Sequence, residues 1–505
     1  MRRAPLLLCL CLPLLPVAAL AQCPDGTPPP CAAARPARAA AASSVAVLYF
    51  DSRSRDSNDL YLADGLTEEI ISRLAGMERL TVRSRHLVQR YRGAAVGDPA
   101  AVGRALNVAY IVTGSVRRAG GRLRVSAELV RADGGAQVWG RQFDQAGDDV
   151  FAIQEAVASE VATGIVGRLL PAERQSLAAR PTTSPAAYEA FLRGNFHAAR
   201  RDSAGLMRAL QEYEAALRGD PGYTDALSRV AWTYGVAQVN GLHVGLPFDT
   251  LAARAMRAAA EAVRRAPNSS DAWLAMGAAR VAAQPRTLAG VQDAVERAIT
   301  LDPTSAEAQH LLGFTLAVLG QDTAALERDR LALAINPARP VTLMHLVHHD
   351  AKAGRHVEAR RWVDSALVFD SQFAPARAAL AALLMLGGDT ARARAEVARW
   401  RDLPQLRDLA EPAELALALA GLDPAAARPL RARIRAAMPS DLPAIQTGYI
   451  AMLLMVASRD AELVVNLFES ARPRGAFVRY FMAFQIFDPI RGDSRFARLF
   501  RETSP

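Results

Sequence analysis

The chain has 505 residues, too many for one hydrophobic core, so two or more domains are expected. Basic residues outnumber acidic ones 60 to 51, for a formal net charge of +9, and Lys352 is the only lysine among them. A scattered arginine surplus is weak evidence for nucleic-acid binding, so no nucleic-acid partner is expected.

The first 21 residues have the three parts of a secretory signal peptide. Arg2 and Arg3 supply a positive start, an apolar run covers residues 6–20, and residues 19–21 read Ala-Leu-Ala, the small-x-small form of a cleavage site. We therefore expect cleavage of residues 1–21 and a periplasmic protein. No later stretch has the about 20 consecutive apolar residues of a transmembrane helix, so no membrane span is expected after cleavage.

Residues 22–43 are a Pro/Ala-rich linker that contains Cys23 and Cys31. In an exported chain, two cysteines around a short Pro-rich loop favour a disulfide. The alternative is a lipid anchor on Cys23, because the residues before it resemble a bacterial lipobox. Gln22 departs from that motif, which prefers a small residue there.

Residues 44–170 alternate strand and helix patterns and predict an α/β domain with a mixed sheet. Glycines at 120 and 121 mark a hairpin between two of the strands. The expected strands are 44–50, 80–82, 108–116, 122–130 and 137–143, and the expected helices are 59–74, 85–91, 99–106 and 148–170.

This segment resembles the TolB amino-terminal-like domain of bacterial envelope and signalling proteins. Four blocks carry the resemblance: VAVLYFD (45–51), YLADGLTEEIISRL (61–74), YIVTGSVRRAGGRLRVSAEL (110–129), and VWGRQFD with the following DVFAIQ (138–154). Relatives carry this domain ahead of tetratricopeptide (TPR) arrays, and some join it to a nucleotide cyclase, a protein kinase or a winged-helix domain. None of those effector domains is visible in this sequence.

Residues 171–186 are expected to form a linker. The pattern of residues 187–400 predicts a TPR array. Pro303 and Pro337 each follow an acidic or amide residue and are 34 positions apart, the length of one helix-turn-helix unit. A longer gap before Pro267 indicates an insertion around 238–249. Residues 401–505 are expected to form TPR-like helix pairs and a C-terminal cap. The fold class is therefore multidomain, an α/β domain followed by an all-α TPR solenoid.

One position departs from the repeat. Asp329 stands where the pattern prefers an aromatic side chain, so that unit is expected to pack less tightly.

No catalytic residue, cofactor or enzymatic activity is expected. The sequence has no phosphate-binding loop, no G-x-S-x-G elbow, and no thiol after Cys31. Glu68 and Glu69 are adjacent on one helix, where neighbouring side chains diverge by roughly 100°, so a solvated helix face is expected there.

His345, His348 and His349 have metal-ligand spacing. His345 and His349 are one helical turn apart and Asp350 is near, but a third ligand and the glutamate of an HExxH motif are missing. Ordinary helix histidines are therefore expected, with a metal site as the alternative. Arginines at 117, 118, 122 and 124 are expected to form a charged sheet face, with an anionic partner as the alternative.

The concave surface of the array remains as the candidate binding site. Its mixture of aromatic, sulfur-containing, acidic and histidine side chains suits an extended peptide or a partner helix. The expected groove residues are Ser228, Trp232, Asp271, Leu274, Glu307, His310, Phe314, Met344 and His348. We expect an exported, non-enzymatic scaffold that assembles envelope components; the alternative is a sensory or regulatory subunit related to cyclase- or kinase-linked proteins.

Overall fold

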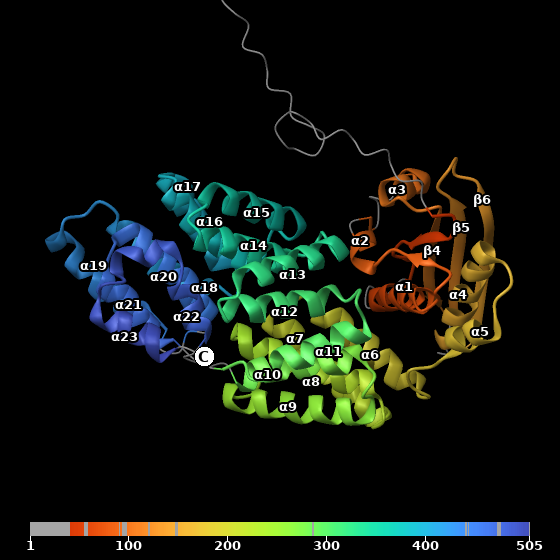
Figure 1. Ribbon diagram of the computed structural model, residues 1–505. Coiled ribbons are helices and arrows are strands. Elements are labelled where there is room, and N and C mark those ends of the chain that lie inside the picture. The colour runs from red at the N-terminus through yellow and green to blue at the C-terminus, as the bar shows by residue number, and fades with distance from the viewer. Residues whose placement is uncertain are drawn as a thin grey trace, which may run out of the picture.

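The computed structural model describes residues 41–54, 59–89, 91–92, 98–119, 122–146, 150–284, 287–439, 442, 444–471 and 476–503. The expected signal peptide and the Cys23–Cys31 disulfide lie outside these residues. An α/β domain lies at one end of the molecule, helical hairpins form the middle, and the C-terminal helices lie at the other end (Figure 1).

The sheet has the mixed topology that the sequence predicts. Its order is β3-β1-β4-β5-β6, with β2 also pairing with β4. Strand β1 pairs in parallel with β3 and with β4, and β2 also pairs in parallel with β4. The β4–β5 and β5–β6 pairs are antiparallel. The strands are β1 (Ser44–Val47), β2 (Asp51–Ser52), β3 (Thr81–Val82), β4 (Tyr110–Ala119), β5 (Arg122–Arg131) and β6 (Gln137–Ala146).

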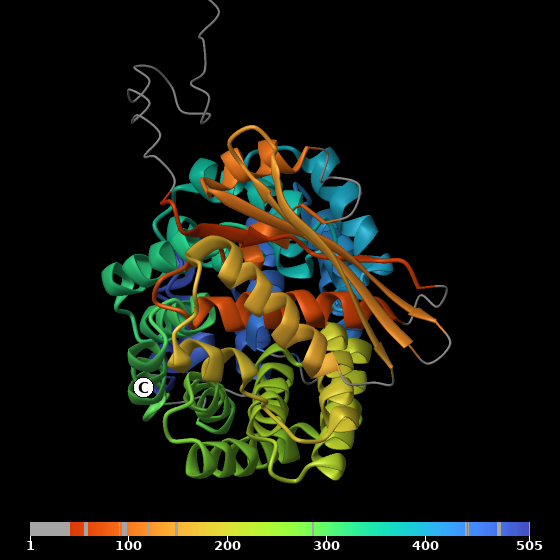
Figure 2. The same ribbon diagram turned by 90° about the vertical axis from the view of Figure 1, so that its right-hand side faces the viewer.

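Helices cover both faces of the sheet. Gly164 of α4 packs against Leu129 of β5, while Gly103 of α3 packs against Ile111 of β4, so α3 and α4 lie on opposite faces. Helices α1 and α4 contact each other along the sheet (Figure 2). The helices are α1 (Leu60–Ala75), α2 (Arg85–Gln89), α3 (Pro99–Leu106) and α4 (Val150–Val166).

The expected linker at 171–186 is corrected by the structure. Residues Pro171–Ala178 form helix α5, and Leu177 is fully buried against the α/β core. Arg79 also donates to Glu173 across 2.6 Å. Proline is compatible with the first turn of a helix, so Pro171 begins a helix and does not mark an unstructured segment.

The middle of the chain is a series of antiparallel helix pairs, which confirms a TPR-like repeat region. The expected insertion corresponds to long helices and a loop: α8 has 17 residues, α9 has 18, and Gly241 ends α8 with a left-handed φ of 64°. The pairs are α6 (Pro185–Ala198) with α7 (Ser203–Gly219), α8 (Thr224–Asn240) with α9 (Phe248–Arg265), α10 (Ser270–Ala283) with α11 (Val291–Leu301), α12 (Ala306–Val318) with α13 (Asp322–Ile335), α14 (Pro340–Lys352) with α15 (His356–Phe369), and α16 (Ala374–Leu386) with α17 (Thr390–Ala398).

The α/β domain and the first hairpin share one core. Leu192 of α6 packs so closely on α1 that a Cβ added to Gly65 would lie 2.7 Å from its side chain. Tyr188 is almost fully buried, and its hydroxyl accepts a hydrogen bond of 2.7 Å from Gln154. These contacts join the sheet domain to the first repeat through buried side chains.

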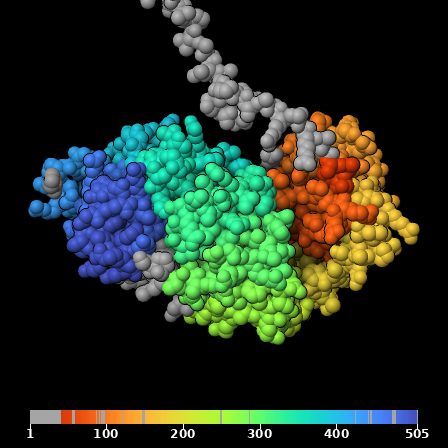
Figure 3. Space-filling model, in the orientation of Figure 1, coloured from red at the N-terminus to blue at the C-terminus, as the bar shows by residue number. Residues whose placement is uncertain are grey.

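The C-terminal segment folds back onto the repeats. Helix α20 contacts α16, α22 contacts α12, and the short helix η4 contacts α14. We call α20, α22 and η4 the C-terminal cover; in the space-filling view the C-terminal helices and the repeats form one continuous surface (Figure 3). The elements are α18 (Arg407–Leu419), α19 (Pro424–Ala437), α20 (Ala444–Ser458), α21 (Ala461–Ser470), α22 (Ala476–Met482), η4 (Gln485–Ile490) and α23 (Ser494–Glu502).

Gly235 allows α8 to approach α10 closely. A Cβ at this position would lie 2.9 Å from the backbone carbonyl oxygen of Ala278, which cannot move without shifting its helix. We therefore expect Gly235→Ala to destabilise the repeats by about 2 kcal/mol, measured by urea unfolding. Gly492→Ala is the control, since a Cβ there meets nothing within 4 Å. Equal unfolding midpoints for the two variants would contradict this account of the helix contact.

Candidate functional site

The inner faces of the repeats and the C-terminal cover enclose a pocket of about 150 Å³. Its walls are apolar and come from α8, α10, α12, α14, α16, α20 and α22, and its polar groups include Arg201, Asn240 and Glu307. The apolar walls comprise Trp232, Val236, Val239, Ala278, Val281, Leu311, Phe314, Val341, Met344, Phe373, Pro375, Ile445, Tyr449, Tyr480 and Phe481.

Six of the nine expected groove residues line this pocket: Trp232, Glu307, His310, Phe314, Met344 and His348. The other three do not. The Ser228 hydroxyl donates to the Thr224 carbonyl of its own helix at 3.1 Å, and Leu274 is buried in the core. The side chain of Asp271 is 53% exposed and lies 3.8 Å from Arg229.

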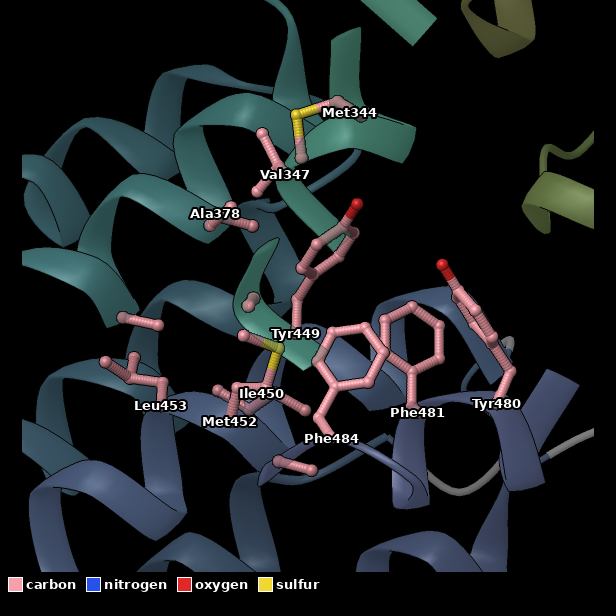
Figure 4. Packing of buried hydrophobic residues seen from close by; sticks show 14 of the residues in the cluster. Met344, Val347, Ala378, Tyr449, Ile450, Met452, Leu453, Tyr480, Phe481 and Phe484 are labelled. Carbon is pink, nitrogen blue, oxygen red and sulfur yellow. The ribbon is translucent and has the colours of Figure 1, made fainter. Parts of the chain in front are cut away.

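The structure differs from the expected open groove, because the C-terminal cover occupies part of the concave face. Phe314 packs against Phe477 of α22 with a ring separation of 5.2 Å, and His348 Nε2 lies 2.9 Å from the Tyr449 hydroxyl of α20. Tyr449, Phe481 and Phe484 gather beneath α14 (Figure 4). The site is therefore a partly closed pocket.

His348 lies inside this aromatic cluster. Its ring is 5.5 Å from Phe481 and 5.8 Å from Tyr480, in edge-on arrangements. Burial, with smaller effects from His345 and His349, lowers the pKa of His348 to about 3, so it is neutral at physiological pH. A neutral imidazole can accept the hydrogen bond of the Tyr449 hydroxyl, which fixes the cover on α14.

The structure explains why Asp329 stands where the repeat pattern prefers an aromatic side chain. Asp329 is fully buried and its Oδ1 lies 2.9 Å from His345 Nδ1, while its Oδ2 lies 3.5 Å from His349 Nε2. Gly313 makes room for the carboxylate, since a Cβ there would lie 2.7 Å from it. Burial opposes ionisation, but the two histidines outweigh it and lower the pKa of Asp329. Contrary to the expectation of loose packing, this unit holds a buried polar network.

The pocket also has a charged side. Arg339 Nη2 lies 2.6 Å from Glu307 Oε2, and Arg201 reaches the same oxygen at 3.5 Å. Arg201 holds a φ of 50°, a region that non-glycine residues rarely adopt. Burial first, and then the charge of His345, lowers the pKa of His310 well below its usual value. The site therefore combines apolar walls with fixed charges and a neutral imidazole.

Asp225, in the first turn of α8, gives the fold a pH-dependent stability. Burial, and then the nearby charge of Asp271, raises the pKa of Asp225 to about 6. The folded state therefore favours the protonated carboxyl, and the cost of ionising it grows as the pH rises from about 4 to about 6. We expect Asp225→Asn to stabilise the fold by about 1 kcal/mol at pH 7.5, less than the full shift because the carboxyl is partly solvated.

This gain should disappear at about pH 4, where the carboxyl is largely protonated in the folded state and the amide is neutral. Thermal unfolding of the variant and the parent chain at the two pH values measures it. A stability difference that is the same at both pH values would contradict the assignment.

Two other groups of charged residues in the α/β domain make polar contacts in the structure. Arg122 and Arg124 both donate to Asp144 at 3.0 Å. Glu68 is not simply solvated, since it accepts hydrogen bonds from Tyr49 at 2.9 Å and Arg85 at 2.8 Å.

Two further expectations concern α14. His345 and His348 both line the pocket. Asp350 faces away from the histidines and accepts a hydrogen bond of 2.9 Å from the Trp362 indole.

Among the described residues, no helix combines the length and apolar character that crossing a membrane requires.

Comparisons with known proteins match parts of the chain. Residues 41–160 match the family model of the HilA/YgeH-like transcriptional regulator, second domain. A protein of Rhizobium meliloti (strain 1021) named "Putative adenylate cyclase 3" is 33% identical over 217 residues, which are 42% of this chain and 37% of that protein. The chain thus spans well under half the length of this relative.

Solved structures resemble the fold only distantly. A thermophilic TPR protein of Thermus thermophilus is 21% identical with a TM-score of 0.33, covering 40% of this chain and 100% of that one. A TPR protein of Parabacteroides merdae ATCC 43184 is 11% identical with a TM-score of 0.32, covering 63% of this chain and 99% of that one.

Proposed function

We propose that the chain is a non-enzymatic interaction scaffold whose pocket holds a short apolar segment of a partner protein. The pocket lining carries this proposal. Aromatic and methionine side chains form the walls, and the Arg201–Glu307 pair supplies polar contacts at one side. Such a combination of apolar burial with a few orienting charges is typical of a binding site.

The size of the pocket limits the partner. Its volume of about 150 Å³ is smaller than the about 300–1,000 Å³ of pockets for drug-sized ligands. One or two side chains fit such a space, whereas a whole helix would have to displace the C-terminal cover. The partner is therefore proposed to insert an apolar side chain, with its backbone or a charged end near Arg201 and Glu307.

Site-specific photo-crosslinking tests this proposal. A photoreactive phenylalanine analogue replaces Trp232 in the pocket, and in a separate variant it replaces Val368, which is 81% exposed on α15. We expect one defined segment of one protein to crosslink through position 232 and not through position 368. The same captured proteins at both positions, or none at position 232, would count against the pocket.

We also propose that the scaffold acts after export and joins envelope components through its TolB-like domain and its pocket. The signal-peptide pattern of residues 1–21 and the resemblance of residues 45–154 support this part. Mass spectrometry of the mature chain from its native host should find Gln22 as the first residue. A mature chain that retains residues 1–21 would contradict the proposed periplasmic location.

A second candidate is a regulatory subunit of a signalling enzyme. The 33% identity to the Rhizobium meliloti protein favours it, and the match covers 37% of that protein. Stable co-purification of a nucleotide cyclase or kinase with the chain, together with retention of residues 1–21, would favour this candidate over the periplasmic scaffold. The purified chain alone is expected to form no cyclic AMP from ATP.

A further inference from the structure

Two histidines and an aspartate meet at one side of the pocket. His310, Asp329 and His345 come from the consecutive helices α12, α13 and α14, and one possible ligand atom from each lies within 4.8 Å of the others. His345 Nδ1 and Asp329 Oδ1 lie 2.9 Å apart, a hydrogen-bond distance that is shorter than the about 3.4 Å between two ligands of a tetrahedral ion with bonds of about 2.1 Å.

Two buried atoms of this cluster have no hydrogen bond. Asp329 Oδ2 and His349 Nε2 lie 3.5 Å apart as an ion pair, but neither atom has a hydrogen-bond partner. Nearly all buried polar atoms in proteins are satisfied by protein groups, water or ions. The Asp329 Oδ2 atom, fully buried beside His349, therefore calls for a further partner, either a water molecule or an ion.

We propose that His310, Asp329 and His345 bind a divalent transition-metal ion of the Zn²⁺ or Co²⁺ type. Two imidazole nitrogens with one carboxylate oxygen favour such ions over Ca²⁺ and Mg²⁺, which prefer oxygen ligands alone. His349 is placed to orient the Asp329 carboxylate or to serve as a fourth ligand. The limit of 4.8 Å exceeds the about 3.4 Å between two tetrahedral ligands, and the rings of His310 and His345 are stacked with centroids 4.3 Å apart. Binding therefore requires the imidazole rings to rotate until their nitrogens converge on one ion.

The location of the cluster gives the ion access to the pocket. His310 and His345 line the pocket, whereas Asp329 lies behind them. A bound ion would join three consecutive helices of the array and direct its remaining coordination positions towards the pocket, where water or a donor group of a bound partner can reach it.

Titration of the full chain with Co²⁺ after chelator treatment tests the site. We expect one equivalent to bind and to give visible absorption bands. His310→Gln should weaken Co²⁺ binding at least about tenfold. His356→Gln is the matched control, since it removes another partly buried histidine away from the cluster and should bind Co²⁺ as the parent chain does.

Two results would overturn the proposal. One is the absence of stoichiometric Co²⁺ binding by the parent chain, and the other is equal affinity of the parent chain and a folded His310→Gln variant. Asp329→Asn should also lose binding, and His310→Gln decides the question if that variant does not fold. Zn²⁺ should raise the thermal unfolding midpoint of the parent chain and not that of His310→Gln.

Discussion

Phe481→Ala is expected to lower the apparent free energy of unfolding by about 4 kcal/mol, because it removes a buried aromatic ring and leaves a cavity. Phe481 is 1% exposed and lies among His348, Tyr449 and Phe484. Its loss should loosen the C-terminal cover on α14. Urea unfolding followed by circular dichroism measures the effect.

Phe369→Ala is the control for this experiment. Phe369 is 44% exposed on α15, so its removal should change the stability by less than about 1 kcal/mol. The parent chain should bind an apolar fluorescent dye weakly and Phe481→Ala should bind it more strongly, because the pocket is enlarged. Similar losses of stability in both variants would show that the cover does not pack on the repeats as described.

Asp329→Ala is expected to destabilise the chain by about 3 kcal/mol, because it leaves the buried His345 and His349 without their anionic partner. The change also opens a small cavity beside Gly313. Thermal unfolding in the presence of a chelator measures this effect separately from any effect of a bound metal.

Asp364→Ala provides the comparison. Asp364 pairs with Arg360 on the surface of α15 and its side chain is 57% exposed, so its loss should cost less than about 1 kcal/mol. If Asp329→Ala is as stable as Asp364→Ala, the buried network does not hold α13 and α14 together.

The local patterns of the sequence predict most of the secondary structure. Strands and helices of the α/β domain begin and end near the expected residues, because each alternates or repeats its apolar positions over a single element. The dipeptide at 302–303 also marks the end of α11 correctly, since Asp302 caps that helix through its backbone. Pro171 is harder to interpret, because proline begins helices as well as interrupting them.

The pocket could be predicted only in part. Trp232, Phe314 and Met344 follow the repeat register, which places them on the inner face. Tyr449 and Phe481 come from outside the regular repeats, and α20 is apolar on nearly all sides, so periodicity gives no sign of the face that it turns to the repeats.

Local sequence patterns could not predict the cluster of His310, Asp329 and His345, for a different reason. His310, Asp329 and His345 are brought together by the packing of three helices, and no spacing within one helix shows it. Asp329 does give a signal, since it breaks the repeat pattern. A charged residue at a position that should be buried indicates either weak packing or a partner, and the structure supplies the partner.

The affinity of the crosslinked partner segment for purified chain variants tests the proposed pocket most directly. Isothermal titration of the synthetic segment should show binding that Trp232→Ala weakens at least about tenfold, as expected for an aromatic anchor. Val368→Ala should bind with the affinity of the parent chain. Equal affinities for all three proteins would show that the partner binds elsewhere and that the concave pocket is not its site.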